Sequence, residues 1–278
     1  MDVDPIVDAD FTGSVDFDYL QLAIACKGTY AYIGGVYLNG ISTVDASDPT
    51  DPIVVGTYYQ GLSNAMINDL EIVGDYLYAA AQWGGILVFD ITTPSSPVFV
   101  GQTPGGFGTV INSSAVAVTE DNLWGFYTDG YEVNPNYDDY VKVVDLSDPS
   151  DPTVVNEIMV QYHFYSDMAL QGDYIYLTET GWFTVLDISV LPSIDIVFTS
   201  NTGFGGNQYD IAVAGSYVYM VNGIWGDGNL TVIDVTDPEL PVPFTSLALP
   251  GGGQGLDEYC GELYIAASYN LLDIVDLY

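Results

Sequence analysis

Short runs of β-branched and aromatic residues alternate with Gly, Pro, Asp and Ser along the whole chain. The pattern is most complete in residues 41–56, which read ISTVDASDPTDPIVVG. An apolar run that ends at an Asp predicts a strand, and the Ser-Asp-Pro that follows predicts a turn. The second Pro opens another strand, and Pro is tolerated there only if that strand lies at the edge of a sheet. The pattern therefore predicts an all-β protein of short strands.

This pattern recurs at intervals that match one four-stranded blade of a β-propeller. Each copy has a marker Asp at the end of its apolar run, and successive markers are 45, 55, 42, 47 and 42 residues apart. Because each marker stands at a turn, we expect it to cap backbone N–H groups rather than to act in catalysis. The markers are Asp45, Asp90, Asp145, Asp187, Asp234 and Asp276.

A second motif, a Gly turn followed by Tyr-x-Tyr, falls between the markers, as in residues 70–78 (LEIVGDYLY). Positions i and i+2 of a strand face the same side, so we expect both rings to pack toward one neighbouring blade. The Gly supplies the positive φ that a tight hairpin needs. Each motif has six copies, which predicts six blades.

The two ends of the chain are predicted to close the ring. The last repeat has three strands, and residues 4–7 (DPIV) match residues 51–54, which open the fourth strand of the first repeat. We therefore expect residues 1–278 to form a single domain in which residues 3–12 complete the sixth blade and remove an open edge. The predicted fold is an all-β, six-bladed β-propeller of four-stranded antiparallel blades.

Residues 141–149 (VKVVDLSDP) and 230–238 (LTVIDVTDP) resemble the repeat of the LVIVD-repeat β-propellers. This family is bacterial and archaeal, and many of its members lie at the cell surface. The resemblance extends over essentially the whole chain. It implies the propeller fold and says little about function. The chain departs from typical members because it has no Arg and almost no Lys.

The charge of the chain excludes several classes of partner. The chain has 38 acidic residues, 30 Asp and 8 Glu, but only Lys27 and Lys142 as basic residues, which gives a net charge of −36. Nucleic acid and anionic membranes are excluded, because both are bound through Lys and Arg. We expect the fold to need screening by salt or calcium, and the excess of Asp favours calcium and an extracellular setting.

Two features of the chain bear on its location. No apolar run reaches 18 residues, so we expect no membrane insertion. The first residues do not read as a signal peptide. We therefore expect either a cytoplasmic protein or a numbering that starts after a removed signal, and we favour the second.

Aromatic residues in the loops opposite the markers predict a ligand-binding rim. They fall in the loops between second and third strands or between blades, where exposed rings suit stacking on sugars or docking a partner. The alternative is that they pack as lids over the blades. The predicted rim consists of Trp83, Trp182, Trp225, Tyr37, Tyr269, Phe107, Phe164 and Phe204.

Two groups of acidic residues are candidate calcium ligands. Asp69, Asp167 and Asp210 stand at equivalent first strands, where they could converge on the mouth of the channel. The third repeat carries an insertion of about ten residues that contains Asp138 and Asp139. This loop lacks the spacing of an EF-hand, and a solvated loop is the alternative.

The two cysteines, Cys26 and Cys260, end the first strands of the first and last repeats. A disulfide between them would join the two ends of the ring, although the alignment places them one residue out of phase. The alternative is two buried free thiols.

No catalytic residues can be assigned from sequence motifs. His163 is the single His, and no Gly-x-Ser-x-Gly motif accompanies it, which argues against a Ser-His-Asp relay. Zinc sites need more His and Cys. The Arg cluster of sialidase propellers is absent, and one His gives little support to a propeller lactonase. A glycosidase that uses a pair of carboxylates stays open.

The sequence favours a non-catalytic propeller, outside the cell or on its surface, that serves as a scaffold or adhesion module. We expect it to bind a protein partner, a glycan or copies of itself as a homo-oligomer, array or filament, with calcium as its possible cofactor and no organic cofactor. One alternative is a calcium-dependent enzyme that acts on sugars or lactones at the channel mouth. The other is a salt-adapted cytoplasmic interaction protein.

Overall fold

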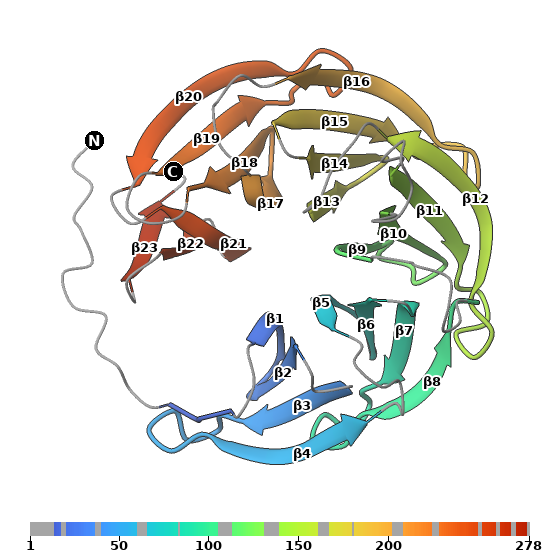
Figure 1. The fold of residues 1–278 in the computed structure, drawn as a ribbon, viewed down its shortest axis with the longest axis vertical. Helices are drawn as coiled ribbons and strands as arrows, with labels where there is room; N and C mark the ends of the chain where they lie inside the picture. The colour runs from blue at the N-terminus through green and yellow to red at the C-terminus, as the bar shows by residue number, and fades with distance from the viewer. Residues whose placement is uncertain are drawn as a thin grey trace. The chain divides into compact units, whose positions relative to one another are not determined.

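Every regular element in the described part of the chain is a β-strand (Figure 1). The computed structural model describes residues 14–17, 21–36, 40–59, 66–82, 84–104, 113–130, 139–160, 167–179, 181–201, 208–223, 228–249, 252–259, 262–267 and 271–276. Within these ranges no helix is long and apolar enough to cross a membrane. The predicted all-β class is therefore confirmed.

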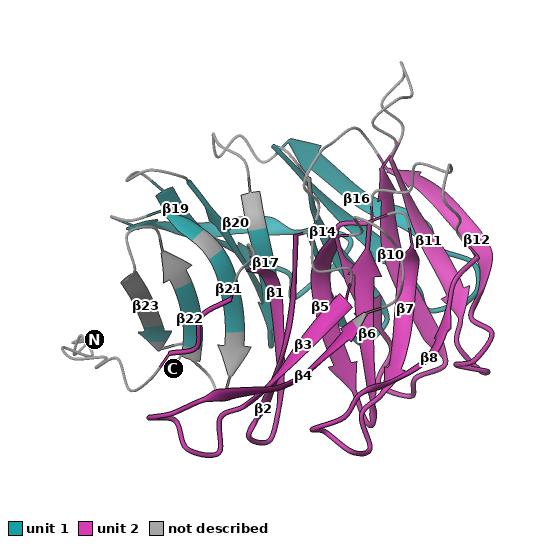
Figure 2. Ribbon diagram, turned by 60° about the horizontal axis from the view of Figure 1, so that its bottom comes forward, with its two compact units in different colours: residues 1–10, 162–278 teal, residues 11–161 magenta. Residues whose placement is uncertain are grey.

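The chain divides into two compact units, which are described separately (Figure 2). Unit 2, residues 11–161, holds three four-stranded antiparallel sheets. The first consists of β1 (Gln21–Lys27), β2 (Tyr30–Gly35), β3 (Gly40–Asp45) and β4 (Ile53–Tyr59). The second consists of β5 (Ile67–Val73), β6 (Tyr76–Ala81), β7 (Gly85–Asp90) and β8 (Val98–Gln102). The third consists of β9 (Val116–Val118), β10 (Trp124–Gly130), β11 (Asp139–Asp145) and β12 (Thr153–Val160).

Unit 1, residues 1–10 and 162–278, holds two four-stranded sheets and one three-stranded sheet in its described part. The first consists of β13 (Asp167–Gln171), β14 (Tyr174–Glu179), β15 (Trp182–Asp187) and β16 (Asp195–Asn201). The second consists of β17 (Gln208–Ala214), β18 (Tyr217–Asn222), β19 (Gly228–Asp234) and β20 (Val242–Leu249). The last consists of β21 (Gly253–Tyr259), β22 (Glu262–Ala267) and β23 (Leu271–Asp276).

The predicted strand order is confirmed, but the predicted number of complete blades is not. In every described sheet the strands pair in sequence order, each antiparallel to the next. Five described sheets have the four strands of a blade, not the predicted six, because the last sheet ends at β23. Residues 3–12, which were expected to supply its fourth strand, lie outside the described residues.

The hairpins between first and second strands have the predicted backbone. Gly28, Gly74, Gly172 and Gly215 have φ values of 62°, 60°, 60° and 58°. In the third sheet this turn is longer, and Asn122 takes the left-handed conformation instead, with φ 59°. Gly and Asn are the residues that adopt this conformation at least cost, so the repeated Gly marks a backbone requirement.

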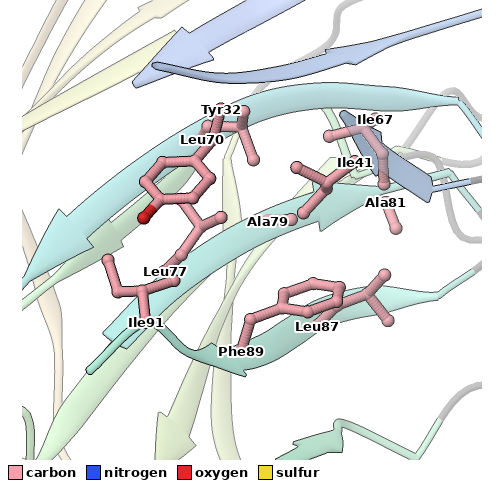
Figure 3. Close-up of a cluster of buried hydrophobic side chains, with 10 residues drawn as sticks. All are labelled: Tyr32, Ile41, Ile67, Leu70, Leu77, Ala79, Ala81, Leu87, Phe89 and Ile91. Carbon is pink, nitrogen blue, oxygen red and sulfur yellow. The ribbon is translucent and has the colours of Figure 1, made fainter. Parts of the chain in front are cut away.

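The second Tyr of each pair packs against the next sheet of its own unit, as predicted. In unit 2, Tyr32 of β2 lies with Ile67, Leu70 and Leu77 of the second sheet (Figure 3). Its hydroxyl donates a hydrogen bond to the carbonyl oxygen of Pro94 at 3.0 Å. Burying the ring while its O–H keeps a partner makes Tyr suited to a joint between sheets.

The same arrangement recurs in the other sheets. Tyr78 joins a cluster with Val116 and Val118 of the third sheet, and Tyr176 joins one with Ile211. Tyr219 lies with Leu256 and other residues of the last sheet. Consecutive sheets within each unit are therefore held together by a repeated aromatic contact.

Each of the five fourth strands carries one β-bulge at the same repeat position. The unpaired residues are Val55, Val100, Val155, Val197 and Phe244. A bulge bends and twists an edge strand, and this discourages another strand from pairing with it. The outer edges are therefore adapted to expose side chains without recruiting further strands.

A substitution at Phe89 tests the packing between the first two sheets. Its ring is fully buried and lies 5.0 Å from the ring of Tyr58 and 5.8 Å from that of Phe99, measured between centroids. We expect Phe89→Ala to lower the free energy of unfolding of the chain by about 3–5 kcal/mol in chemical denaturation, because it leaves a cavity. Val98→Ala, at a side chain that is 59% exposed, is the control and should change it by less than about 0.5 kcal/mol. Equal effects of the two substitutions would contradict this packing.

Candidate functional site

The marker aspartates cap turns, as predicted. Each of the five whose side chain is described accepts the backbone N–H two residues further on, at 2.8–2.9 Å. The backbone N–H and the hydroxyl of Ser47 lower the pKa of Asp45, and the hydroxyl and N–H of Ser189 lower that of Asp187. These carboxylates are therefore ionised and held in local hydrogen bonds.

The carboxylates of the first strands join neighbouring sheets. In unit 2, Asp69 of β5 accepts the N–H of Leu70 with Oδ1, at 2.7 Å, and the N–H of Val116 with Oδ2, at 2.8 Å. Val116 begins β9, the edge strand of the next sheet. An edge strand has N–H groups without a partner in its own sheet, so Asp69 supplies an acceptor that the sheet lacks.

Unit 1 repeats this contact between its three sheets. Asp210 of β17 accepts the N–H of Ile211 with Oδ1, at 2.8 Å, and the N–H of Leu256 on β21 with Oδ2, at 2.7 Å. Asp167 of β13 accepts the same Ile211 N–H with Oδ2, at 3.1 Å. One carboxylate position thus links β13 to β17 and β17 to β21.

A β-bulge precedes two of these aspartates. In β5 the pairing with β6 skips Asn68, and in β17 the pairing with β18 skips Tyr209. A bulge redirects the side chain that follows it. The sequence indicated that Asp69, Asp167 and Asp210 were equivalent. It gave no sign of the bulge, because neither Asn68 nor Tyr209 is a residue typical of one.

Glu71 lies beside Asp69, two residues further along β5. Its Oε2 atom is enclosed and has no hydrogen-bond partner. Burial, with a smaller contribution from the charge of Asp69, raises the pKa of Glu71 to about 8. Glu71 is therefore neutral at neutral pH, and its proton reduces the repulsion between two acids on one strand.

The structure gives the predicted channel-mouth ligands a structural role. Asp69, Asp167 and Asp210 each accept backbone N–H groups. Among the described residues, no group of three or more His, Cys, Asp and Glu side chains is placed to hold a metal ion. In the insertion of the third repeat, Asp139 begins β11 and Asp138 lies outside the described residues.

Only one residue of the predicted aromatic rim lies in the described part of the chain. Trp182 begins β15, pairs with Asn201 across the sheet and is half-buried. The seven rim residues outside the described part are Tyr37, Trp83, Phe107, Phe164, Phe204, Trp225 and Tyr269. The rim therefore stays a prediction.

The predictions for the cysteines and the histidine also stay untested. Cys26 lies in β1 of unit 2, while Cys260 and His163 lie outside the described residues. The disulfide between Cys26 and Cys260 is therefore still a prediction.

The two lysines lie in unit 2, where each contacts acidic groups. Lys27 Nζ donates to Asp75 Oδ1 at 2.7 Å and to the carbonyl oxygen of Gly74 at 2.8 Å, which joins the hairpins of the first two sheets. Lys142 lies between Asp129, at 3.4 Å, and Glu157, with which it forms an ion pair. Burial raises the pKa of Asp129, although Lys142 opposes this. Both lysines are thus part of the fold.

The fourth strands expose apolar side chains, which the sequence pattern did not reveal. β20 is the clearest case, since seven of its eight residues are exposed. We define the β20 surface as Val242, Phe244 and Leu247, which are 58%, 63% and 51% exposed. Exposed groups of apolar residues of this kind are typical of interaction sites. A proline directly precedes four of the five fourth strands, β16 being the exception. It indicated an edge, but not which side chains an adjoining strand would cover.

Leu247 differs from its counterpart in the first sheet. Leu247 pairs with Leu230, and Tyr58 of β4 pairs with Ile41, both four residues before a marker Asp. Tyr58 is half-buried and stacks on Phe99 of β8, the fourth strand of the next sheet, with centroids 6.1 Å apart. The sheet that follows β20 has no fourth strand in its described part, and Leu247 is exposed.

The repeat pattern of the strands agrees with a known family. The LVIVD repeat matches residues 22–60, 66–103, 137–160, 165–202 and 205–246, which together make up well over half of the chain. The chain belongs to the LVIVD repeat family. In the first two LVIVD segments the match runs from the first strand of a sheet to its fourth, so one LVIVD repeat corresponds to one blade.

Solved structures similar to this LVIVD repeat protein include a β-propeller domain. A functionally unknown protein from Desulfotomaculum acetoxidans is 12% identical, with a TM-score of 0.71, over 95% of this chain and 84% of the other. A β-propeller domain from Myceliophteria thermophila is 11% identical, with a TM-score of 0.66, over 91% and 82%. The periplasmic gluconolactonase of Pseudomonas aeruginosa is 10% identical, with a TM-score of 0.65, over 92% and 73%.

These similarities establish the fold as a β-propeller of four-stranded antiparallel blades. At such low identities they carry no information on function. No curated protein sequence matches the chain.

The raised pKa of Glu71 predicts how the stability of this LVIVD repeat protein depends on pH. The pKa of Glu71 is about 8 in the folded chain, whereas the ordinary pKa of a Glu side chain is 4.5. Between these two pH values the folded state holds a proton that the unfolded state has lost. Stability therefore falls as pH rises through this window. We expect Glu71→Gln to leave stability near pH 4.5 almost unchanged and to raise it at pH 9 by a few kcal/mol, roughly one to three, as measured by denaturation at both pH values.

Glu120→Gln is the matched control, because it removes the same charge at an exposed site. It should change stability little at either pH. If Glu71→Gln has no greater effect than Glu120→Gln at pH 9, the carboxyl of Glu71 is ionised in the folded protein and the assignment is wrong.

Proposed function

We propose that this LVIVD repeat protein is a non-catalytic scaffold or adhesion module outside the cell or on its surface. It binds a protein partner or further copies of itself through apolar side chains on the fourth strands of its blades. The observation that carries this proposal is the exposure of those side chains on a chain whose net charge is −36. A chain so acidic has abundant polar residues, so exposed Val, Phe and Met on its edges favour a contact surface.

The described apolar residues recur on all five fourth strands. They are Ile53, Val54 and Val55 on β4, Val98 on β8, Val154, Val155 and Met159 on β12, Ile196 on β16, and Val242, Phe244 and Leu247 on β20. The bulge in each strand discourages strand pairing, so the contact is made by side chains. The partner is therefore expected to present an apolar face rather than an extended strand.

The hydrogen bonds that the described carboxylates already make to backbone N–H groups favour a binding role over catalysis. The five described marker aspartates hold turns, and the first-strand aspartates join sheets. A catalytic carboxylate pair needs two groups free to reach the reacting atoms, as in glycosidases. The aromatic rim, with half-buried Trp182, is proposed as a second surface that stacks on a glycan.

The negative charge sets the conditions for assembly. Copies of this chain repel one another at low ionic strength, and the repulsion weakens as the Debye length shortens. Calcium reduces it further by binding to carboxylates, so calcium is the proposed cofactor. Both conditions fit an extracellular or salt-rich setting.

We also propose that the ring has six blades and that residues 3–12 complete the last one, within a single domain. Residues 4–7 (DPIV) match the residues that open β4, and Leu247 is exposed where its counterpart Tyr58 is covered by a fourth strand. A strand beside β23 would satisfy the edge of the three-stranded sheet.

Hydrogen exchange tests this closure. In the full chain we expect the backbone amides on the outer edge of β23 to be protected, because the N-terminal strand accepts them. A chain without residues 2–12 should lose protection at β23 by tenfold or more and keep it at β3, its counterpart in the first sheet. Equal exchange at β23 in the two chains would contradict closure by this segment.

Analytical ultracentrifugation tests the proposed assembly. We expect the sedimentation coefficient to rise with protein concentration in 1 M NaCl or millimolar CaCl₂, and the double variant Val242→Ser, Phe244→Ser to weaken association at least tenfold. Thr245→Ser, at a neighbouring exposed residue of β20, is the matched control and should behave as the unmodified chain. The melting temperature of each variant separates loss of contact from loss of fold, because Phe244 also contacts Tyr217.

One outcome would overturn self-association and another the non-catalytic role. A monomer at every concentration, salt and calcium level would exclude self-association through β20. Turnover of glycans or lactones that is abolished by a chelator would replace the scaffold with a calcium-dependent enzyme.

A further inference from the structure

Lys142 lies between two acidic side chains on one face of the third sheet of unit 2. Its Nζ atom is 3.4 Å from Oδ2 of Asp129 and forms an ion pair with Oε2 of Glu157. Glu157 on β12 pairs directly with Lys142 on β11. On β10 the partner of Lys142 is Tyr127, two residues before Asp129, and positions two apart face the same side of a sheet. The three charged side chains therefore share one face, across three neighbouring strands (Figure 1).

Burial distinguishes this cluster from the contact that the other lysine makes. The side chains of Lys142 and Asp129 are 15% and 17% exposed, whereas that of Glu157 is 52% exposed. The side chains of Lys27 and Asp75, which form the ion pair between the first two sheets, are 28% and 63% exposed. Removing charges from water is costly, so a neutral group suits the place of Lys142 and Asp129 better than two charges.

A lysine at this position is not a general requirement of the blade. Lys142 lies three residues before the marker Asp145, and the corresponding residues of the first and fourth sheets are Ser42 and Thr184. In those two sheets the residue opposite is a threonine, and the paired hydroxyls are hydrogen-bonded at 3.0 Å and 3.2 Å. A neutral pair of hydroxyls is therefore sufficient to join a third strand to a fourth, and the charged groups of the third sheet need another explanation.

We propose that Lys142 and Asp129 condense to an amide bond that cross-links β10 to β11, with Glu157 as the proton carrier. Nζ of Lys142 forms a bond with Cγ of Asp129, and the bond from Cγ to one carboxyl oxygen breaks. One ammonium proton passes directly to that oxygen. Glu157 takes a second proton from the nitrogen and delivers it to the same oxygen, which leaves as water. An ammonium and a carboxylate thus become an amide and water, with no other reactant.

The surroundings of the three groups suit this reaction. Groups that a fold holds in contact react as if each were present at a very high concentration, about 10⁵ M or more. Burial lowers the pKa of Lys142, but Glu157 and Asp129 outweigh this effect and keep the proton on the nitrogen. A base that touches Nζ is therefore needed, and Glu157 accepts a hydrogen bond from it. Burial also raises the pKa of Asp129, although Lys142 opposes the rise, and this favours the carboxyl form that an amine attacks.

The bond would tie together the two ends of the insertion in the third repeat. This insertion lies between Asp129 and Lys142 in the sequence, so the amide would close it into a covalent loop. Closing a loop restricts the unfolded chain and thereby stabilises the folded one. The cross-link goes beyond the proposed scaffold role and does not depend on it.

Mass spectrometry of the intact, denatured full chain tests the proposal. We expect a mass lower than the sequence mass by one water molecule. Lys142→Arg and Asp129→Ala should each have the full mass of their sequence, because each removes one of the two reacting groups. Lys27→Arg, in the exposed ion pair, is the matched control and should keep the loss of water. Glu157→Gln should lower the cross-linked fraction by about tenfold or more, because it removes the proton carrier.

Digestion with trypsin gives a second, independent readout. Trypsin cleaves after Lys and Arg, and the chain has Lys27, Lys142 and no Arg. An amide on Nζ of Lys142 removes that cleavage site, so the denatured chain should give two fragments, cut after Lys27 alone. Asp129→Ala should give three fragments. The mass and the fragments of the unmodified chain decide the question even if a variant fails to fold.

Two results would overturn the amide bond. One is an unmodified chain that has its full sequence mass and gives three tryptic fragments. The other is a loss of water that survives Lys142→Arg, which would place the dehydration in the backbone between Asp129 and Gly130. An unchanged cross-linked fraction in Glu157→Gln would contradict the role of Glu157 as the proton carrier.

Discussion

The structure depends on how the free edges of the first strands are satisfied. Each first strand lies at the edge of its sheet, so part of its backbone N–H groups find no acceptor within that sheet. Carboxylates from the preceding sheet supply the acceptor, from Asp69 to Val116 and from Asp210 to Leu256. Each of these hydrogen bonds crosses from one sheet to the next. It therefore satisfies an N–H group at a sheet edge and also joins two blades. Tyr rings at the second strands pack beside these joints, Tyr78 with Val116 and Tyr219 with Leu256.

Backbone N–H groups also take the role that basic side chains have in most proteins. The chain has 38 acidic residues and two lysines, so few carboxylates can form ion pairs. Marker aspartates bind turn N–H groups, first-strand aspartates bind edge N–H groups, and Glu71 retains a proton. Other described carboxylates, such as those of Asp51, Asp151 and Asp195, are exposed, and their charge has to be screened by ions. This ties the stability of the chain to the ions in its surroundings.

Much of the repeat could be predicted because its signals are local. An Asp before Ser or Thr binds an N–H two residues away, a Gly after a strand adopts positive φ, and Tyr-x-Tyr presents two rings on one side. The bulges in the first strands could not be predicted, because neither Asn nor Tyr, the residues at positions 68 and 209, is typical of a bulge. The roles of Asp69, Asp167 and Asp210 were equally hidden. Their alignment suggested a cation site, which stays a prediction, and the structure adds that one oxygen of each accepts a backbone N–H of the next sheet.

The sequence by itself determined the strands, the turns, the order of strands within each sheet and the family, because each depends on residues within a few positions or on the period of the repeat. The tertiary structure alone decided which groups meet. Asp167 and Ile211 are 44 residues apart, and nothing in the residues around either one names the other as its partner. Whether a carboxylate retains a proton or holds a neighbouring sheet depends on distances of a few ångströms between such residues, and only the packing of one sheet on the next sets those distances.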